Sequence, residues 1–206
     1  MNTRLIALLA CGAFIPPCSA QQPAPRRVLR RSLDVVTQLR VTDTVFIASP
    51  RACGHAPSGI AIDSAFDAAF PDAYNQDGVF AILRTPLDNS RIGYLLRVPS
   101  QYESSAIDLW EFDQRRDAWR APIRMADAFG DGPWALTWWA WLVDLNRDGH
   151  KDLVLRHQES RINETSLKQS TSDSLFIRMW DGVYAPATLT ADSTLRAVFD
   201  PQRWCR

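Results

Sequence analysis

The stretch TWWAWLVDLNRDGHKDLVLRH, residues 137–157, joins two apolar runs through a polar loop. The run at 137–144 carries three tryptophans, and the run at 151–157 alternates leucine and valine with polar residues at both ends. Aromatic and β-branched runs of this length are typical of strands, whereas the Asp, Asn and Gly between them favour a turn. The stretch therefore predicts strand, loop and strand.

Six other runs in the chain have the same composition and are bounded by Asp, Asn, Gly, Pro or Ser. They lie at 43–49, 79–85, 92–99, 106–113, 174–180 and 183–189. Residues 29–39 and 63–70 could each form a short helix. Eight strand candidates against two short helices predict an all-β fold, built mainly from antiparallel hairpins.

Residues 105–127 and 174–192 resemble each other. Each reads as a strand, an aromatic-Asp turn, an aromatic residue, Ala-Pro and a second strand. The second copy contains Asp181-Gly182, a dipeptide that favours tight hairpin turns. Two similar hairpins predict a propeller-like or partial-propeller architecture, with a β-sandwich as the alternative.

The loop DLNRDGHKD, residues 144–152, places oxygen ligands at the spacing of a metal site. Asp144, Asn146, Asp148 and Asp152 stand at loop positions 1, 3, 5 and 9, and the carbonyl of His150 stands at position 7. Calcium takes six to eight such oxygens, and Gly149 permits the sharp fold that a short loop needs around the ion. The alternative is a turn without metal, since Asn, Asp and Gly also gather in turns for backbone reasons.

This loop is not an EF-hand, because Leu155 stands where that motif has a bidentate glutamate. It resembles the calcium loops of FG-GAP and VCBS-type repeats, in which Asp-x-Asn-x-Asp-Gly-x-x-Asp-Leu sits between two strands. The resemblance covers residues 143–155 and implies a structural Ca²⁺ held by Asp144, Asn146, Asp148, the His150 carbonyl and Asp152. A partial copy at 74–80 lacks the outer carboxylates and is interpreted as a turn.

The amino-terminal residues look like an export signal. Arg4, an apolar run at 5–15 and the small residues Ser19 and Ala20 predict a signal peptide at 1–20. A flexible tether at 21–32 and one β-rich calcium-binding domain at 33–206 would follow. The protein is then periplasmic or secreted, and no run is long enough for a membrane span. A lipoprotein anchored at Cys11 is the minority alternative.

Cleavage after Ala20 leaves Cys53 and Cys205 as an even pair in an oxidising compartment. We expect a disulfide between them, which would tie the carboxyl-terminal tail to the start of the domain. Two free, buried thiols are the alternative.

Composition and motifs narrow the function. Lys and Arg total 23, as do Asp and Glu, so no net field would attract nucleic acid. No catalytic signature is present, and we predict no catalytic residue. Trp138, Trp139 and Trp141 are expected to pack in the core or, alternatively, to expose a binding platform.

The sequence thus predicts a non-enzymatic, calcium-binding β domain that binds an unknown protein or glycan of the bacterial envelope. Some exported proteins with similar calcium loops act as periplasmic lysozyme inhibitors or immunity-type proteins, so the resemblance implies such a partner. The alternative is a small hydrolase of cell-wall or extracellular polysaccharide. Two close carboxylates in an open cleft would favour the hydrolase.

Overall fold

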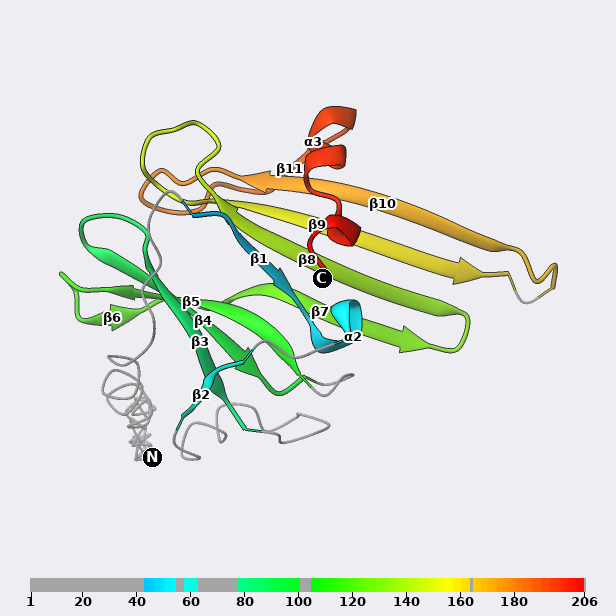
Figure 1. Ribbon diagram of the computed structural model, residues 1–206, viewed down its shortest axis with the longest axis horizontal. Helices are drawn as coiled ribbons and strands as arrows, with labels where there is room; N and C mark the ends of the chain where they lie inside the picture. Colours follow the sequence, from blue (N-terminus) through cyan, green and yellow to red (C-terminus); the bar gives the residue numbers. More distant parts are fainter. Residues whose placement is uncertain (1–42, 55–57, 63–77, 101–104, 164, 206) are drawn as a thin grey trace, which may run out of the picture.

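The computed structural model of the protein describes residues 43–54, 58–62, 78–100, 105–163 and 165–205 (Figure 1). Several predictions concern residues outside these ranges and are not addressed by the structure. They are the signal peptide at 1–20, the tether at 21–32, the helices at 29–39 and 63–70, and most of the partial loop copy at 74–80.

The described chain forms one open sheet in which every pair of neighbouring strands is antiparallel. The strands are β1 (Val45–Ala48), β2 (Ile60–Ala61), β3 (Phe80–Pro86), β4 (Arg91–Val98), β5 (Ala106–Asp113), β6 (Ala118–Trp119), β7 (Ile123–Asp131), β8 (Trp134–Val143), β9 (Asp152–Ile162), β10 (Gln169–Arg178) and β11 (Thr188–Thr190). The main path runs β11-β10-β9-β8-β7-β5-β4-β3-β2, with β1 beside β8 and β6 beside β5. The all-β prediction is confirmed. A propeller is not shown, because the described strands join one sheet.

Strand β7 bends the sheet into two layers. Its first half pairs with β5, up to Ala126 opposite Ile107, and its second half pairs with β8, from Asp127 opposite Trp138. Where β7 leaves β8, β1 takes its place, with Ala48 opposite Trp139. We call β2 to β6 with the start of β7 the first layer, and the end of β7 with β8 to β11 and β1 the second layer. Figure 1 shows the second layer lying over the first.

The inner faces of the two layers share one apolar core. The first layer contributes Leu95, Ile107 and Leu109 among others, and the second contributes Ala140, Leu142, Leu153 and Leu155. Alternate residues of a strand point to opposite faces, so neighbours of these residues face outward. In having two layers around a core the fold is close to the sandwich alternative, although here the layers belong to one continuous sheet.

The outer face of the second layer is covered by the carboxyl-terminal segment. Trp139, Trp141 and Leu175 pack there against Phe199 and Trp204, which flank the short helices α3 (Ser193–Val198) and η2 (Pro201–Arg203). A disulfide joins Cys205 to Cys53 at the end of helix α2 (Pro50–Cys53), with 5.1 Å between the Cα atoms. The predicted disulfide is confirmed.

The resemblance between residues 105–127 and 174–192 is a structural one. In the first copy the aromatic pair is Phe112 opposite Trp119, and in the second it is Trp180 opposite Tyr184. After each pair the chain passes Ala-Pro and returns along the preceding strand, as β7 along β5 and as β11 along β10. The predicted strand at 183–189 is mostly this return, and only 188–190 is strand.

In the described ranges, no helix is long and apolar enough to cross a membrane.

Candidate metal loop and binding cleft

The predicted metal loop connects β8 to β9 and is folded by its own polar side chains. Asp144 accepts hydrogen bonds from the backbone N–H of Asp148 (3.1 Å) and of Gly149 (3.0 Å). The Oδ1 atom of Asn146 accepts from the same Asp148 N–H, also at 3.1 Å. Arg147 and Gly149 take positive φ angles of 63° and 87°, which close the turn. The loop therefore gathers Asp144, Asn146 and Asp148 around one backbone N–H.

Asp148 completes this cluster on the exposed side of the loop. Its Oδ1 accepts from the His150 N–H at 2.8 Å, and its Oδ2 accepts from the Asn146 amide at 2.8 Å. The backbone hydrogen bond from His150, and then that from Asn146, hold the pKa of the Asp148 carboxyl below its ordinary value. Asp148 is therefore ionised across the physiological pH range.

Asp152 is not part of this cluster of three side chains and is fully buried. Its Oδ2 accepts from the Leu145 N–H at the start of the loop (3.0 Å), and its Oδ1 accepts from the Trp180 N–H (2.8 Å). One carboxylate thus ties the loop to the segment that follows β10.

His150 ties the loop to the other layer. Its Nδ1 lies 2.9 Å from the carbonyl oxygen of Leu87, just after β3. The neighbouring Lys151 is fully buried and donates from Nζ to the carbonyl of Asp43, ahead of β1. Burial lowers the pKa of this lysine. The loop therefore contacts three segments that are distant in sequence.

The donor chemistry of the loop fits a hard cation in part. No group of three or more His, Cys, Asp or Glu side chains that could hold a metal ion gathers within the described ranges. The gathered donors are two carboxylates and one amide oxygen, Asp144, Asp148 and Asn146, and these are ligand types that calcium prefers. The carboxylate oxygens of Asp152 each already accept one hydrogen bond, but a carboxylate oxygen has a second lone pair.

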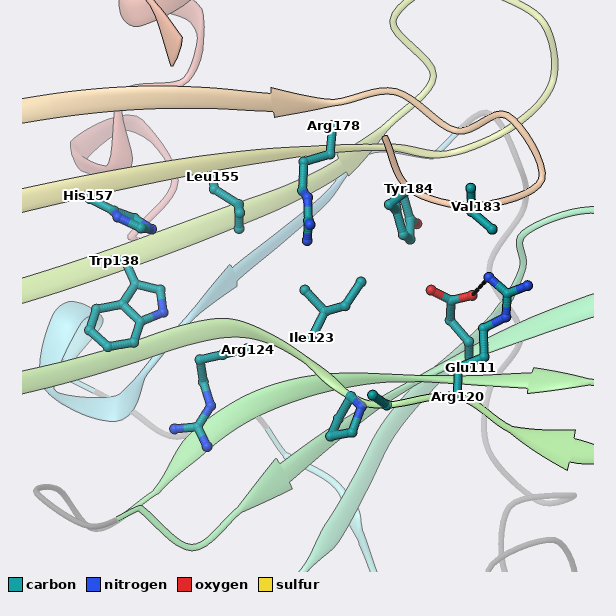
Figure 2. A pocket seen from close by; sticks show the side chains of 12 residues that line it. Glu111, Arg120, Ile123, Arg124, Trp138, Leu155, His157, Arg178, Val183 and Tyr184 are labelled. Atoms are coloured by element: carbon teal, nitrogen blue, oxygen red, sulfur yellow. Dashed lines mark ion pairs between the residues drawn. The ribbon is translucent and has the colours of Figure 1, made fainter. Parts of the chain in front are cut away.

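An open cleft lies between the two layers. Its cavity volume is about 660 Å³, which is in the range of small-molecule sites. Figure 2 shows Trp138 and His157 at one end, Glu111 and Arg120 at the other, and Ile123 on the floor between them. The cleft is therefore apolar in the middle and polar at its ends.

Three arginines and one carboxylate line the cleft. The Nη1 atom of Arg120 lies 3.9 Å from the Oε2 atom of Glu111. Arg124 donates a hydrogen bond to Asp108 at 2.5 Å and also forms an ion pair with Asp127. Arg178 donates from Nε to the Ala185 carbonyl at 3.1 Å, and Figure 2 shows its guanidinium directed into the space between the layers. The lining residues favour an anion.

Glu111 is 4% exposed, and its Oε2 has no hydrogen-bond partner in the described ranges. Burial raises the pKa of this carboxyl, while Arg120 and Arg91 act in the opposite direction. The buried hydroxyl of Tyr184 also lacks a hydrogen-bond partner among the described residues. Burial, followed by the charges of Glu111 and Asp152, raises the pKa of this phenol, so it stays protonated.

The three tryptophans of the predicted platform do not share a surface. Trp139 and Trp141 are buried beneath the carboxyl-terminal segment, where Trp141 contacts Phe199 at 5.3 Å between ring centroids. Trp138 points to the opposite side, is half-buried, and lies 5.8 Å from the ring of His157 in the cleft. Only Trp138 of the three could therefore meet a ligand there.

The cleft was not predicted from the sequence, although the internal resemblance between residues 105–127 and 174–192 pointed to the hairpins that form it. Glu111, Arg120 and Arg124 lie in the first copy of the internal resemblance, and Arg178 and Tyr184 lie in the second. The two copies face each other across the cleft. A pair of similar hairpins that close on each other through a bent sheet would have indicated a site between them.

Comparison of the chain with protein families, with curated proteins and with solved structures finds no match in any of the three. The loop and the cleft are therefore the features from which a function can be inferred.

Proposed function

We propose that this protein is an exported, calcium-stabilised β domain that binds a protein or glycan of the bacterial envelope through the cleft between its layers. Calcium would be structural, held by Asp144, Asn146, Asp148 and the His150 carbonyl, with Asp152 closing the set. A periplasmic inhibitor or immunity-type role, as in exported proteins with similar FG-GAP or VCBS-type loops, is the most concrete form of this proposal.

The observation that carries the proposal is the position of Asp152. Its carboxylate accepts hydrogen bonds from the loop, at Leu145, and from Trp180, which pairs with the cleft residue Tyr184. An ion held by the loop would therefore fix one wall of the cleft through Asp152 and Trp180. This gives a structural ion a function, since a preorganised cleft loses less freedom on binding.

The cleft supports binding more than hydrolysis of a polysaccharide. Glycoside hydrolases commonly use two carboxylates that flank the scissile bond. Glu111 is the one carboxylate among the described lining residues, and its nearest charged lining partner is an arginine. The hydrolase stays as the second candidate because Glu111 is buried and its raised pKa suits a general acid.

Calcium titration tests the structural part of the proposal. A site of about 10⁻⁴ M, filled at a hundredfold excess of calcium, should raise the melting temperature of a chain of this size by about 5–10 °C. Asp148→Ala should abolish the rise, whereas Asp131→Ala should keep it because Asp131 is an exposed residue at the end of β7, outside the 144–152 loop. No calcium-dependent change in the wild type would overturn the metal site.

Retention from envelope extracts tests the binding part. The full chain, immobilised with calcium, should retain a protein or glycan from periplasmic or cell-wall fractions, and chelator should release it. Purified peptidoglycan should stay intact over the same period. Turnover of peptidoglycan that is lost in Glu111→Gln, without stable retention, would favour the hydrolase instead.

A further inference from the structure

The polar groups of the cleft point to the ligand that it takes. Within the described residues Arg178 donates one hydrogen bond, from Nε to the Ala185 carbonyl, and its two terminal nitrogens make none. The Tyr184 hydroxyl and the Glu111 Oε2 are buried without a hydrogen-bond partner in the same ranges. Buried polar atoms in native proteins nearly always have partners, so these atoms indicate polar groups of a ligand or its waters.

The charge of this site comes from Arg178. Arg120 faces Glu111 at 3.9 Å, and Arg124 is held by Asp108 and Asp127. Within the described residues Arg178 makes no ion pair, although its charge still acts on the Glu111 carboxyl. A guanidinium offers two parallel N–H groups, which match the two oxygens of a carboxylate.

The remaining lining residues describe the body of the ligand. Trp138 and Tyr184 provide aromatic walls, and the apolar side chains of Ile123 and Leu155 line the cleft from β7 and from β9 (Figure 2). Glu111 Oε2 can accept hydrogen bonds from hydroxyl groups, and the Tyr184 hydroxyl can donate or accept. A ring with one carboxylate and several hydroxyl groups would satisfy all of these side chains.

We infer that the cleft binds an acidic sugar, with the carboxylate on Arg178, hydroxyl groups on Glu111 and Tyr184, and the ring against Trp138. The inference rests on the proposed envelope-binding function and names its ligand class. A peptide fits less well, because bound peptides commonly add to a free strand edge. Trp138 and Leu155 lie on β8 and β9, which are paired on both sides.

Two matched sugars test the role of the carboxylate. N-acetylmuramic acid and N-acetylglucosamine share a ring and differ by a carboxylate-bearing group, so we would titrate each into the full-length protein and follow tryptophan fluorescence and calorimetric heat. The acidic sugar should bind at least about tenfold more tightly, which is the ratio expected for a charge-assisted hydrogen bond. Equal affinity of the two sugars, or no binding of either, would overturn the inference.

Variants locate the site. Arg178→Gln should remove the preference for the acidic sugar, whereas Arg203→Gln, an equal loss of charge on the exposed η2, should keep it. Trp138→Phe keeps an aromatic wall and should weaken both sugars alike. Because Arg178→Gln could disturb the Ala185 contact, Arg178→Lys is the second variant. This lysine keeps the positive charge but lacks the two parallel N–H groups of arginine, so it should retain only part of the preference for the acidic sugar.

A peptide arm separates the alternatives. Tetra-alanine with a free carboxyl terminus should bind more weakly than the acidic sugar, and tighter binding of the peptide would reassign the cleft to a peptide carboxylate. If envelope fractions are retained but the acidic sugar is ignored, the inference fails and the proposed function stands. If neither is retained, both fail.

Discussion

Asp152 accepts backbone hydrogen bonds from both the loop that connects β8 to β9 and the turn beside the cleft. An asparagine at this position keeps one carbonyl oxygen and turns an N–H toward the other donor, so either Leu145 or Trp180 loses its acceptor. A buried donor left without a partner costs about 1–3 kcal/mol, and Asp152→Asn should lower the free energy of unfolding by that amount. Urea unfolding measures the loss.

Asp181→Asn is the matched control for this prediction. Asp181 is exposed and lies one residue from Trp180, so its amide variant should change the free energy of unfolding by less than about 0.5 kcal/mol. An equal effect of the two substitutions would contradict the role assigned to the Asp152 carboxylate.

At the residue scale, spacing alone predicted which loop side chains come together. Asp144, Asn146 and Asp148 lie within five residues of one another, and the hydrogen bonds that Asp144 and Asn146 accept from the Asp148 N–H are local. The second contact of Asp152 could not be predicted this way, because its donor Trp180 is 28 residues away and is positioned by β10. The gathering of these three side chains was therefore predictable from their spacing, and the link of Asp152 to the cleft was not.

At the scale of elements, the strands with strong local patterns were predicted, and of the bent strand only the first half was, as the second strand of the 105–127 copy. The run at 106–113 is β5 with the same bounds, because its aromatic and branched side chains suit a strand that pairs with its neighbours and packs in the core. Strand β7 reads IRMADAFGD, with no apolar alternation, since its two halves belong to different layers. The helices α2, α3 and η2 were also missed, as each is six residues or fewer.

The carboxyl-terminal segment is an element whose stability can be measured separately. Two kinds of contact hold it over the tryptophans of the second layer. One is the disulfide, and the other is Asp173, which receives two hydrogen bonds from Arg156 at 2.8 and 2.9 Å and one from Arg196 at 2.9 Å. Arg156 also donates to the carbonyl of Phe199 at 2.7 Å, so the segment has contacts that do not depend on the disulfide.

Removing the disulfide should destabilise the protein without releasing the whole segment. The bond joins residues 152 positions apart, and closing a loop of that length contributes about 5 kcal/mol in the chain-entropy description. Cys53→Ser with Cys205→Ser should lower the melting temperature by at least about 5 °C. Hydrogen exchange should then quicken first at residues 193–205, and the same double variant with Asp173→Asn should lose protection there entirely.

At the scale of the whole molecule, the bend in β7 turns two similar hairpins into opposite walls of one cleft. The bend also places Arg124 between Asp108 on β5 and Asp127, the first β7 residue paired with β8. Ser100 donates to the same Asp127 carboxylate at 3.1 Å. Two buried carboxyl groups that share one arginine therefore lie at the junction of the layers, and their protonation should change the free energy of unfolding.

The pH dependence of unfolding should reveal this junction. Burial raises the pKa of Asp108 to about 6, against the opposing effect of Arg124, and burial also raises the pKa of Asp127. Well below pH 4 Asp108 is protonated in both the folded and the unfolded state. Between about pH 4 and about pH 6 the unfolded state has released this proton and the folded state still holds it, so the free energy of unfolding falls by up to about 3 kcal/mol over this range and is level above it.

Asp108→Asn should remove most of this fall, because the amide stays neutral and can still accept from Arg124. The difference in unfolding free energy between the variant and the wild type should thus grow in favour of the variant as the pH rises from about 4 to about 7. Urea titrations across this range measure it, with the exposed Asp131→Asn as the control. A difference that stays constant with pH would show that Asp108 is ionised in the folded protein at all these pH values, and that Arg124 outweighs burial at the junction of the layers.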